Sequence, residues 1–176
     1  MKKRSLTVTR PELLSDGSDA SFRSLIHDII AYSGRIQEIR GSFGSAIGLT
    51  GSQYTVLISI AYLQGDGGVG INSVAEHLHL SGAFVTSETN KLVADGLVEK
   101  RNDDDDRRRV RLTITNEGRR RLNRLSKIQA PVNDLLFATL TRAEFLQLSK
   151  FMARLVGNSD EALALLQFLM KRDLED

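Results

Sequence analysis

Residues 72–114 read NSVAEHLHLSGAFVTSETNKLVADGLVEKRNDDDDRRRVRLTI. Apolar residues at helical spacing stand on both sides of the turn at residues 81–82, which predicts two short helices. Gly96 ends the second helix, and apolar and polar residues then alternate at 97–101 and at 109–114, as in two strands. Because an aspartate-rich turn separates these strands, the predicted order is helix, turn, helix and charged hairpin, which is the order of a winged helix-turn-helix.

Further helices precede this stretch. Apolar residues from 19 to about 43 recur at spacings of three and four, which predicts one long helix. Thr50 followed by Gln53 is a capping-box pattern and predicts the start of a second helix. The glycines at 65–70 end that helix.

The link to the helix-turn-helix is short. Residues 69–71 are predicted to form a very short strand. Asn72 or Ser73 is then expected to cap the first helix of the helix-turn-helix, because both side chains can accept a hydrogen bond from the first turn.

The region after the hairpin is predicted to be helical. Thr115 is expected to cap a helix over 118–140, which Pro131 can kink. A second capping box opens a helix over 141–155, and a separate last helix covers 160–174.

These elements divide the chain into four regions. Residues 1–19 contain few large apolar groups and are expected to form a flexible arm. Residues 20–48 are predicted to be a dimerisation helix, 49–115 a winged helix-turn-helix lobe, and 116–176 the C-terminal helices that complete the dimerisation region. The predicted fold class is mainly α with a small β-hairpin wing, a winged helix-turn-helix with N- and C-terminal dimerisation helices.

Composition excludes several classes of function. The 176 residues carry 24 Lys and Arg against 22 Asp and Glu, so the net charge of +2 says little about partners. Arginines cluster between residues 107 and 121, which predicts a local basic face. There is no cysteine, which excludes disulfides, thiolate nucleophiles and thiolate zinc ligands. We expect a cytoplasmic protein without a signal peptide or a membrane span.

The sequence motifs do not support an enzymatic activity or a metal site. His77 and His79 stand two apart on a predicted helix and therefore point to different faces, while the aspartates at 103–106 lie in a turn. The chain has no phosphate-cradling glycine loop, nucleophile elbow or paired acid–base motif. We therefore expect no metal, no cofactor and no enzymatic activity.

The wing carries a resemblance to a known family. Residues 106–118, DRRRVRLTITNEG, resemble the wing signature D-x-R-x-x-x-L-x-L-T-x-x-G of the MarR family, with Ile114 in place of one leucine. The likeness extends over residues 20–155. The chain departs from the family pattern at Ser87, where a basic residue is common, and at Glu88, where an apolar residue is common.

The resemblance implies a role for the wing arginines. Arg108, with Arg107 beside it, would contact DNA, because a guanidinium suits a narrow, negative minor groove. Asp106, two residues from Arg108, would orient it. The alternative is an exposed turn in which Arg108 forms an ordinary surface ion pair with Asp106.

The second helix of the helix-turn-helix supplies further candidates for DNA contact. Thr86, Ser87, Asn90 and Lys91 are expected on its exposed side, where short polar groups and a cation reach base edges or phosphates. The backbone amides at Ser81 and Gly82, at the helix start, are also candidates because the helix dipole favours a phosphate there. The alternatives are a merely polar helix face and a simple turn with a cap.

The function that the resemblance implies is regulatory. It predicts a homodimer that binds double-stranded DNA at a pseudo-palindromic operator, as a repressor or less often an activator, and that is released by a small, often aromatic anionic ligand. An aromatic wall and a cation for such an effector could come from the region where the first two helices meet. The candidates are Tyr32, Arg35, Ile36, Arg40, Phe43 and Tyr54. The alternative is that they only pack or face solvent.

A different class of function is also open. Winged helices also serve as protein-interaction adaptors that never touch DNA. A substitution of Lys91 or Arg108 that leaves DNA affinity unchanged would favour the adaptor.

Overall fold

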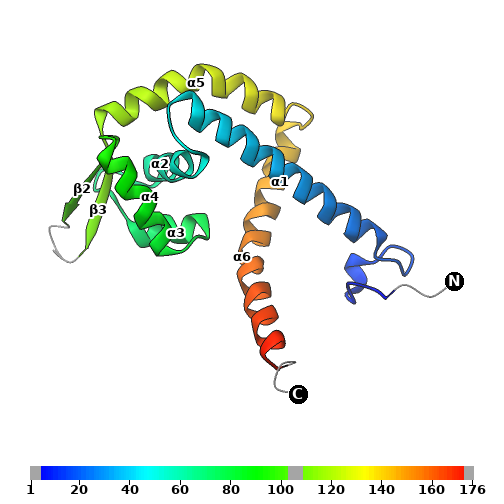
Figure 1. Ribbon diagram of the computed structural model, residues 1–176. Coiled ribbons are helices and arrows are strands. Elements are labelled where there is room, and N and C mark those ends of the chain that lie inside the picture. Colours follow the sequence, from blue (N-terminus) through cyan, green and yellow to red (C-terminus); the bar gives the residue numbers. More distant parts are fainter. Residues whose placement is uncertain (1–4, 103–108, 173–176) are drawn as a thin grey trace. The chain divides into compact units, whose positions relative to one another are not determined.

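The computed structural model describes residues 5–102 and 109–172 (Figure 1). The chain forms two compact units, residues 1–127 and 128–176. The elements are a short 3-10 helix η1 (Pro11–Leu13), α1 (Ala20–Ala46), α2 (Gly51–Leu63), β1 (Val69–Gly70), α3 (Ile71–Leu78), α4 (Gly82–Ala94), β2 (Val98–Asn102), β3 (Val110–Ile114), α5 (Asn116–Leu136) and α6 (Arg142–Arg172). Helices with one small sheet confirm the predicted fold class.

The core of the first unit surrounds α2. This helix packs against α1, α3, α4 and β3, and in Figure 1 it lies behind α4 and beside the strands. Since α2 has neighbours on most sides, its sequence is apolar nearly all round rather than along one stripe. Fully buried core side chains include Val56, Leu57 and Ile60 of α2, Val74 of α3, Val85 and Leu92 of α4, and Leu112 of β3, and α1 adds Phe43, which is 5% exposed.

Both predicted capping boxes are present. The Gln53 N–H donates to Thr50 Oγ1 at 3.2 Å, and the Thr50 N–H donates to Gln53 Oε1 at 2.9 Å. At the start of α6 the Glu144 N–H donates to Thr141 Oγ1 at 3.3 Å, and the Thr141 N–H donates to Glu144 Oε2 at 2.8 Å. These bonds satisfy amides that have no partner inside their own helices.

The start of α3 differs from the prediction. The helix begins at Ile71 with Gly70 as its N-cap, rather than after a cap by Asn72 or Ser73. The reason is the sheet: Gly70 is paired with Arg111 of β3, so the chain passes from extended backbone straight into the helix. In contrast, the start of α4 follows the prediction.

The wing is a three-stranded antiparallel sheet in the order β1-β3-β2. The predicted hairpin is confirmed, with Val98 opposite Ile114 and Asn102 opposite Val110. A Cβ on Gly118 would lie 2.5 Å from the Leu97 carbonyl oxygen, so only glycine fits where α5 leaves the sheet.

The junction of the sheet and α5 is also hydrogen-bonded. Thr115 caps α5 as predicted, because its Oγ1 accepts from the Gly118 N–H at 3.0 Å and donates to the Gly96 carbonyl at 2.7 Å. One threonine thus links α5 to the end of α4.

The C-terminal helices have other bounds than the sequence predicts. α5 ends at Leu136, and Pro131 lies inside it. Instead of separate helices over 141–155 and 160–174, α6 runs unbroken from Arg142 to Arg172. Gly157 suggests a break, but a single glycine costs a helix only about 1 kcal/mol, which flanking good helix formers offset.

Residues 5–19 contain local structure. Thr7 donates to Asp19 Oδ2 from its N–H at 2.8 Å and from its hydroxyl at 2.7 Å, and Arg23 pairs with Oδ1. Asp19 is only 2% exposed. The backbone and hydroxyl hydrogen bonds from Thr7, followed by the charge of Arg23, lower the pKa of Asp19 despite its burial.

Within residues 5–102 and 109–172, no single helix is both long and apolar enough to cross a membrane. Only α1 and α2 together have the length and composition of a span, and this pair is bent by 86°.

Candidate nucleic-acid interface

One side of α4, the predicted recognition helix, is exposed and polar. Ser87, Asn90 and Lys91 lie on it, and the Ser81 side chain caps the helix by accepting from the Phe84 N–H at 3.2 Å. The opposite side is buried through Val85, Glu88, Thr89 and Leu92. Short polar groups on an exposed helix face are what base-edge contact requires.

Two of the predicted contact residues are less accessible than expected. Thr86 is half-buried, and its hydroxyl donates to the Gly82 carbonyl at 2.8 Å. This bond to the preceding turn is a common alternative for a helical threonine. Gly82 itself is half-buried in the first turn of α4.

Lys91 is paired with a buried carboxylate. Its ammonium donates to Glu88 Oε1, and the Ser52 hydroxyl of α2 donates to Glu88 Oε2 at 2.8 Å. Burial raises the pKa of Glu88, but the hydrogen bonds from Lys91 and Ser52 and the charge of Lys91 outweigh burial, so the pKa lies below its usual value. Glu88 is therefore ionised at neutral pH.

A lysine on the wing reaches α4. Lys100 of β2 donates from its ammonium to Asn90 Oδ1. This bond joins the wing to the exposed face of α4 and orients the Asn90 amide. The sequence prediction did not include Lys100, although its polar position in an alternating strand was a signal for an outward-facing cation.

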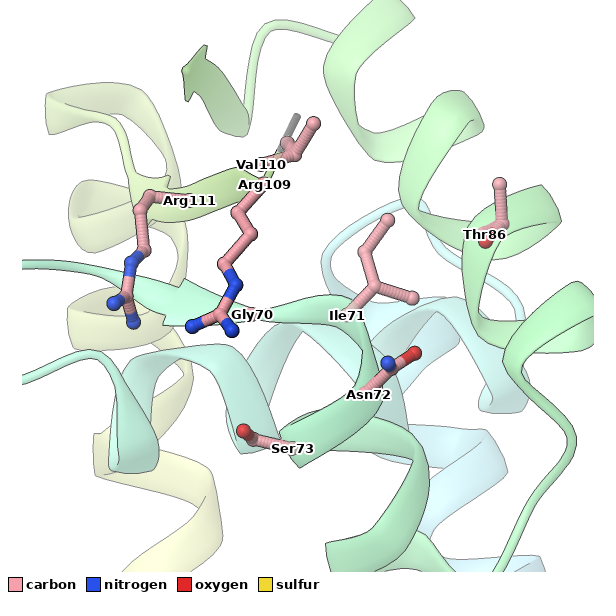
Figure 2. A pocket seen from close by; sticks show the side chains of 8 residues that line it. All are labelled: Gly70, Ile71, Asn72, Ser73, Thr86, Arg109, Val110 and Arg111. Carbon is pink, nitrogen blue, oxygen red and sulfur yellow. The ribbon is translucent and has the colours of Figure 1, made fainter. Parts of the chain in front are cut away.

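A hollow of about 470 Å³ lies where β3 meets the start of α3. Figure 2 shows Arg109, just before β3, and Arg111 of β3 extending to the same side of the chain, while Val110 points away. The lining residues are Gly70, Ile71, Asn72, Ser73, Thr86, Arg109, Val110 and Arg111.

The chemistry of this hollow suits an anion. Asn72 and Ser73 belong to the first turn of α3, and among the described residues no side chain caps that turn. The positive end of a helix dipole, two guanidinium groups and two short polar side chains therefore meet at one place. The arginine cluster is visible in the sequence, but the meeting of Asn72, Ser73, Arg109 and Arg111 is not, because the hollow depends on the pairing of β1 with β3.

The predicted wing contacts Asp106, Arg107 and Arg108 lie outside the described residues. Their roles stay predictions.

The predicted effector residues lie in different surroundings. Phe43 is 5% exposed and Tyr54 is fully buried, and their rings meet edge to face at 6.2 Å. The Arg40 guanidinium lies 5.3 Å from the centre of the Tyr54 ring. Phe43 and Tyr54 thus belong to the packing between α1 and α2, because both side chains are buried and their rings contact each other across the two helices.

The other three predicted effector residues lie on α1. Ile36 is half-buried, and Tyr32 is 40% exposed. Arg35 is exposed and pairs with Glu38 at 2.5 Å.

A second hollow of about 460 Å³ lies near these residues. Of the six candidates, Arg40 lines it. The lining residues are Gln37 and Arg40 of α1, Gly51, Ser52 and Thr55 of α2, Leu80, and Phe84 of α4. Leu80 and Phe84 are 41% and 40% exposed, so this wall is apolar and open to solvent.

The fold and this face define a winged helix-turn-helix protein. The model of the MarR family matches residues 47–109, and this match confirms the resemblance to that family which the sequence predicts. No curated protein sequence matches the chain at a significant level.

Solved structures share the fold at low identity. A MarR protein from Peptoclostridium difficile is 19% identical with a TM-score of 0.66, covering 90% of this chain and 96% of that chain. A MarR-family transcriptional regulator from Silicibacter pomeroyi is 19% identical with a TM-score of 0.66, covering 86% and 96%. A mutant of MarR from E. coli, complexed with operator DNA, is 19% identical with a TM-score of 0.64, covering 77% and 95%.

Proposed function

We propose that this protein is a homodimeric, sequence-specific double-stranded DNA-binding regulator, acting as a repressor on a pseudo-palindromic operator in the cytoplasm. The observation that carries the proposal is the exposed polar face of α4 beside the basic hollow at the start of α3. The E. coli MarR mutant was solved with operator DNA, and a MepR mutant from S. aureus was solved with an oligodeoxyribonucleotide. Their common fold supports DNA as the partner.

The two parts of the face have different tasks in this proposal. Ser87 and Asn90 of α4 read base edges in the major groove, where amide and hydroxyl groups discriminate between base pairs. Arg109 and Arg111 hold a backbone phosphate in the hollow and fix the register of the protein on the duplex. The wing arginine Arg108, as the family resemblance implies, contacts the adjacent minor groove.

Dimerisation is supported by exposed apolar side chains. On α1, Leu25 is 55% exposed and Ile30 is 63% exposed. On α6, Phe168 is 63% exposed and Leu166 is 52% exposed. Apolar surface of this extent marks an interaction site, and a second copy supplies an equally apolar partner. Two copies would place two recognition helices on the two halves of an inverted repeat.

We place the proposed effector site in the second hollow rather than at all six of the residues first predicted. Arg40 offers a cation, and Leu80 and Phe84 offer an apolar wall, which together suit a small aromatic anion. Since α1, α2 and α4 all contribute, a ligand there would prefer one placement of α4 over another. It would release DNA only if it bound the DNA-incompetent state more tightly.

Selection of binding sites from a random duplex pool at physiological salt tests this function. We expect enrichment of an inverted repeat whose half-sites lie about one helical turn apart. If no sequence is enriched, sequence-specific binding fails and the protein-interaction adaptor becomes the better account.

The phosphate-binding role has its own test. Arg111→Ala should weaken binding to the selected and to a scrambled duplex by the same factor, and should reduce the salt slope of affinity by about 0.9 per subunit. Arg124→Ala, an exposed arginine of α5, is the matched control for the lost charge. A salt slope that Arg111→Ala leaves unchanged would remove the hollow from the DNA interface.

A further inference from the structure

Glu88 is a buried acid on the helix that is proposed to read DNA. Its side chain is 5% exposed, whereas that of Lys91, one turn later, is 56% exposed. A buried charge is costly unless it is paired and hydrogen-bonded. Both carboxylate oxygens have partners here, Lys91 on Oε1 and Ser52 on Oε2.

The carboxylate is fixed from two helices. Ser52 lies in the first turn of α2, and its hydroxyl donates to Glu88 at 2.8 Å. The positive end of the α2 dipole favours a carboxylate at this place. Glu88 therefore stays where it is when DNA approaches, and a phosphate has to compete with it for the Lys91 ammonium.

The ion pair between Glu88 and Lys91 reduces the positive charge that α4 presents to DNA. A free lysine that neutralises a phosphate releases counterions, which is the main source of sequence-independent affinity. An ion-paired lysine adds no net charge to the face. We propose that Glu88 limits the electrostatic part of DNA affinity by withholding Lys91 from the phosphate backbone. This inference rests on the proposed function and refines the role of Lys91 as a DNA contact.

A cycle of variants tests the inference on a scrambled duplex over a series of salt concentrations. Glu88→Gln should tighten binding about fivefold per subunit at 0.15 M salt and steepen the salt slope by about 0.9 per subunit. Lys91→Ala should leave the slope unchanged in the wild-type background and should cancel the steepening in the Glu88→Gln background.

The matched control is Glu38→Gln. Glu38 forms an exposed pair with Arg35, three residues earlier on α1. Its loss changes the net charge by the same amount, and we expect it to leave the salt slope unchanged. An equal steepening by Glu38→Gln would show a general charge effect and overturn the inference.

The remaining outcomes are distinguishable. If Lys91→Ala lowers the slope by about 0.9 in the wild-type background, Lys91 already neutralises a phosphate and the inference is wrong. Lys91→Ala leaves the buried Glu88 with the hydrogen bond from Ser52 alone, so circular dichroism checks the fold of both variants. If Glu88→Gln does not fold and Lys91→Ala does, the salt slope of Lys91→Ala decides the question. Wild-type protein that binds no duplex would overturn the proposed function and the inference together.

Discussion

α2 and α6 are both rich in large apolar side chains, yet their surroundings are opposite. α2 has Tyr54, Val56, Leu57 and Ile60 buried in the first unit, while α6 has no buried residue along its described length, Arg142–Arg172. The free energy gained by burial is about 25 cal/mol per Å² of apolar surface, so an apolar helix left in water is a costly feature. In the proposed homodimer, α2 maintains the fold of one chain, whereas α6 contributes to the contact between the two chains.

The strongest test of this contrast compares leucines on the two helices. Leu57→Ala in α2 should lower the free energy of unfolding by about 2–5 kcal/mol, because it leaves a cavity among fully buried neighbours. Urea denaturation measures the loss, which should not depend on protein concentration. The matched change Leu163→Ala in α6, at a side chain that is 55% exposed, should have an effect that grows with concentration. Equal losses at every concentration would contradict the contrast.

A charge on α6 should act on assembly. Leu166→Lys places an ammonium on a residue that is 52% exposed in the single chain. If Leu166 is buried between two copies, the dimer should weaken by about 2 kcal/mol or more, which is a change of at least about thirtyfold in its dissociation constant. Analytical ultracentrifugation measures it. An unchanged dimer would exclude this part of α6 from the interface.

In the buried core of the first unit, a substitution of Thr89 should increase stability. Its hydroxyl is fully buried and has no hydrogen-bond partner among the described residues. Thr89→Val removes this unpaired polar group at nearly constant volume, so the free energy of unfolding should rise by about 1 kcal/mol. Thermal unfolding shows the change as a higher Tm. A lower Tm would mean that the hydroxyl has a partner in solution.

The smallest expected effect is at the first turn of the exposed helix α6, where Glu144 makes stability depend on pH. Hydrogen bonds from the Thr141 hydroxyl and N–H lower the pKa of Glu144 below its usual value. Because the pKa is lowered in the folded state, the stabilisation is present above the unfolded pKa of about 4.3 and is lost as pH falls through the folded pKa. An NMR titration should give Glu144 a midpoint below about 4.3, and Thr141→Ala should raise that midpoint. A midpoint unaffected by Thr141→Ala would contradict the cap.

The sequence predicted those features that depend on neighbours along the chain. Periodicity identified the helices and the hairpin, and the capping boxes at Thr50 and Thr141 identified two helix starts. The sequence predicts two helices where α6 is one. Gly157 and Asn158 are poor helix formers, and local residues alone do not show that the good helix formers on both sides outweigh them.

Features that depend on distant residues were missed. The bond between Ser52 and Glu88 spans 36 positions, and the hollow of Arg109 and Arg111 exists only because β1 pairs with β3. The burial of Tyr54 likewise depends on how α1 packs on α2. The spacing of residues along the sequence does not predict contacts between distant segments. The candidate site was therefore predicted less completely than the fold.

Sequence-specific DNA binding is best tested by the ratio of two affinities, that for the selected duplex and that for a scrambled duplex. Both affinities are measured by fluorescence anisotropy in the same buffer at 0.15 M salt. We expect a ratio of about 10³ or more, because base contacts add to a phosphate affinity that both duplexes share. A ratio near one would contradict it, since the protein would then recognise only the charge of DNA.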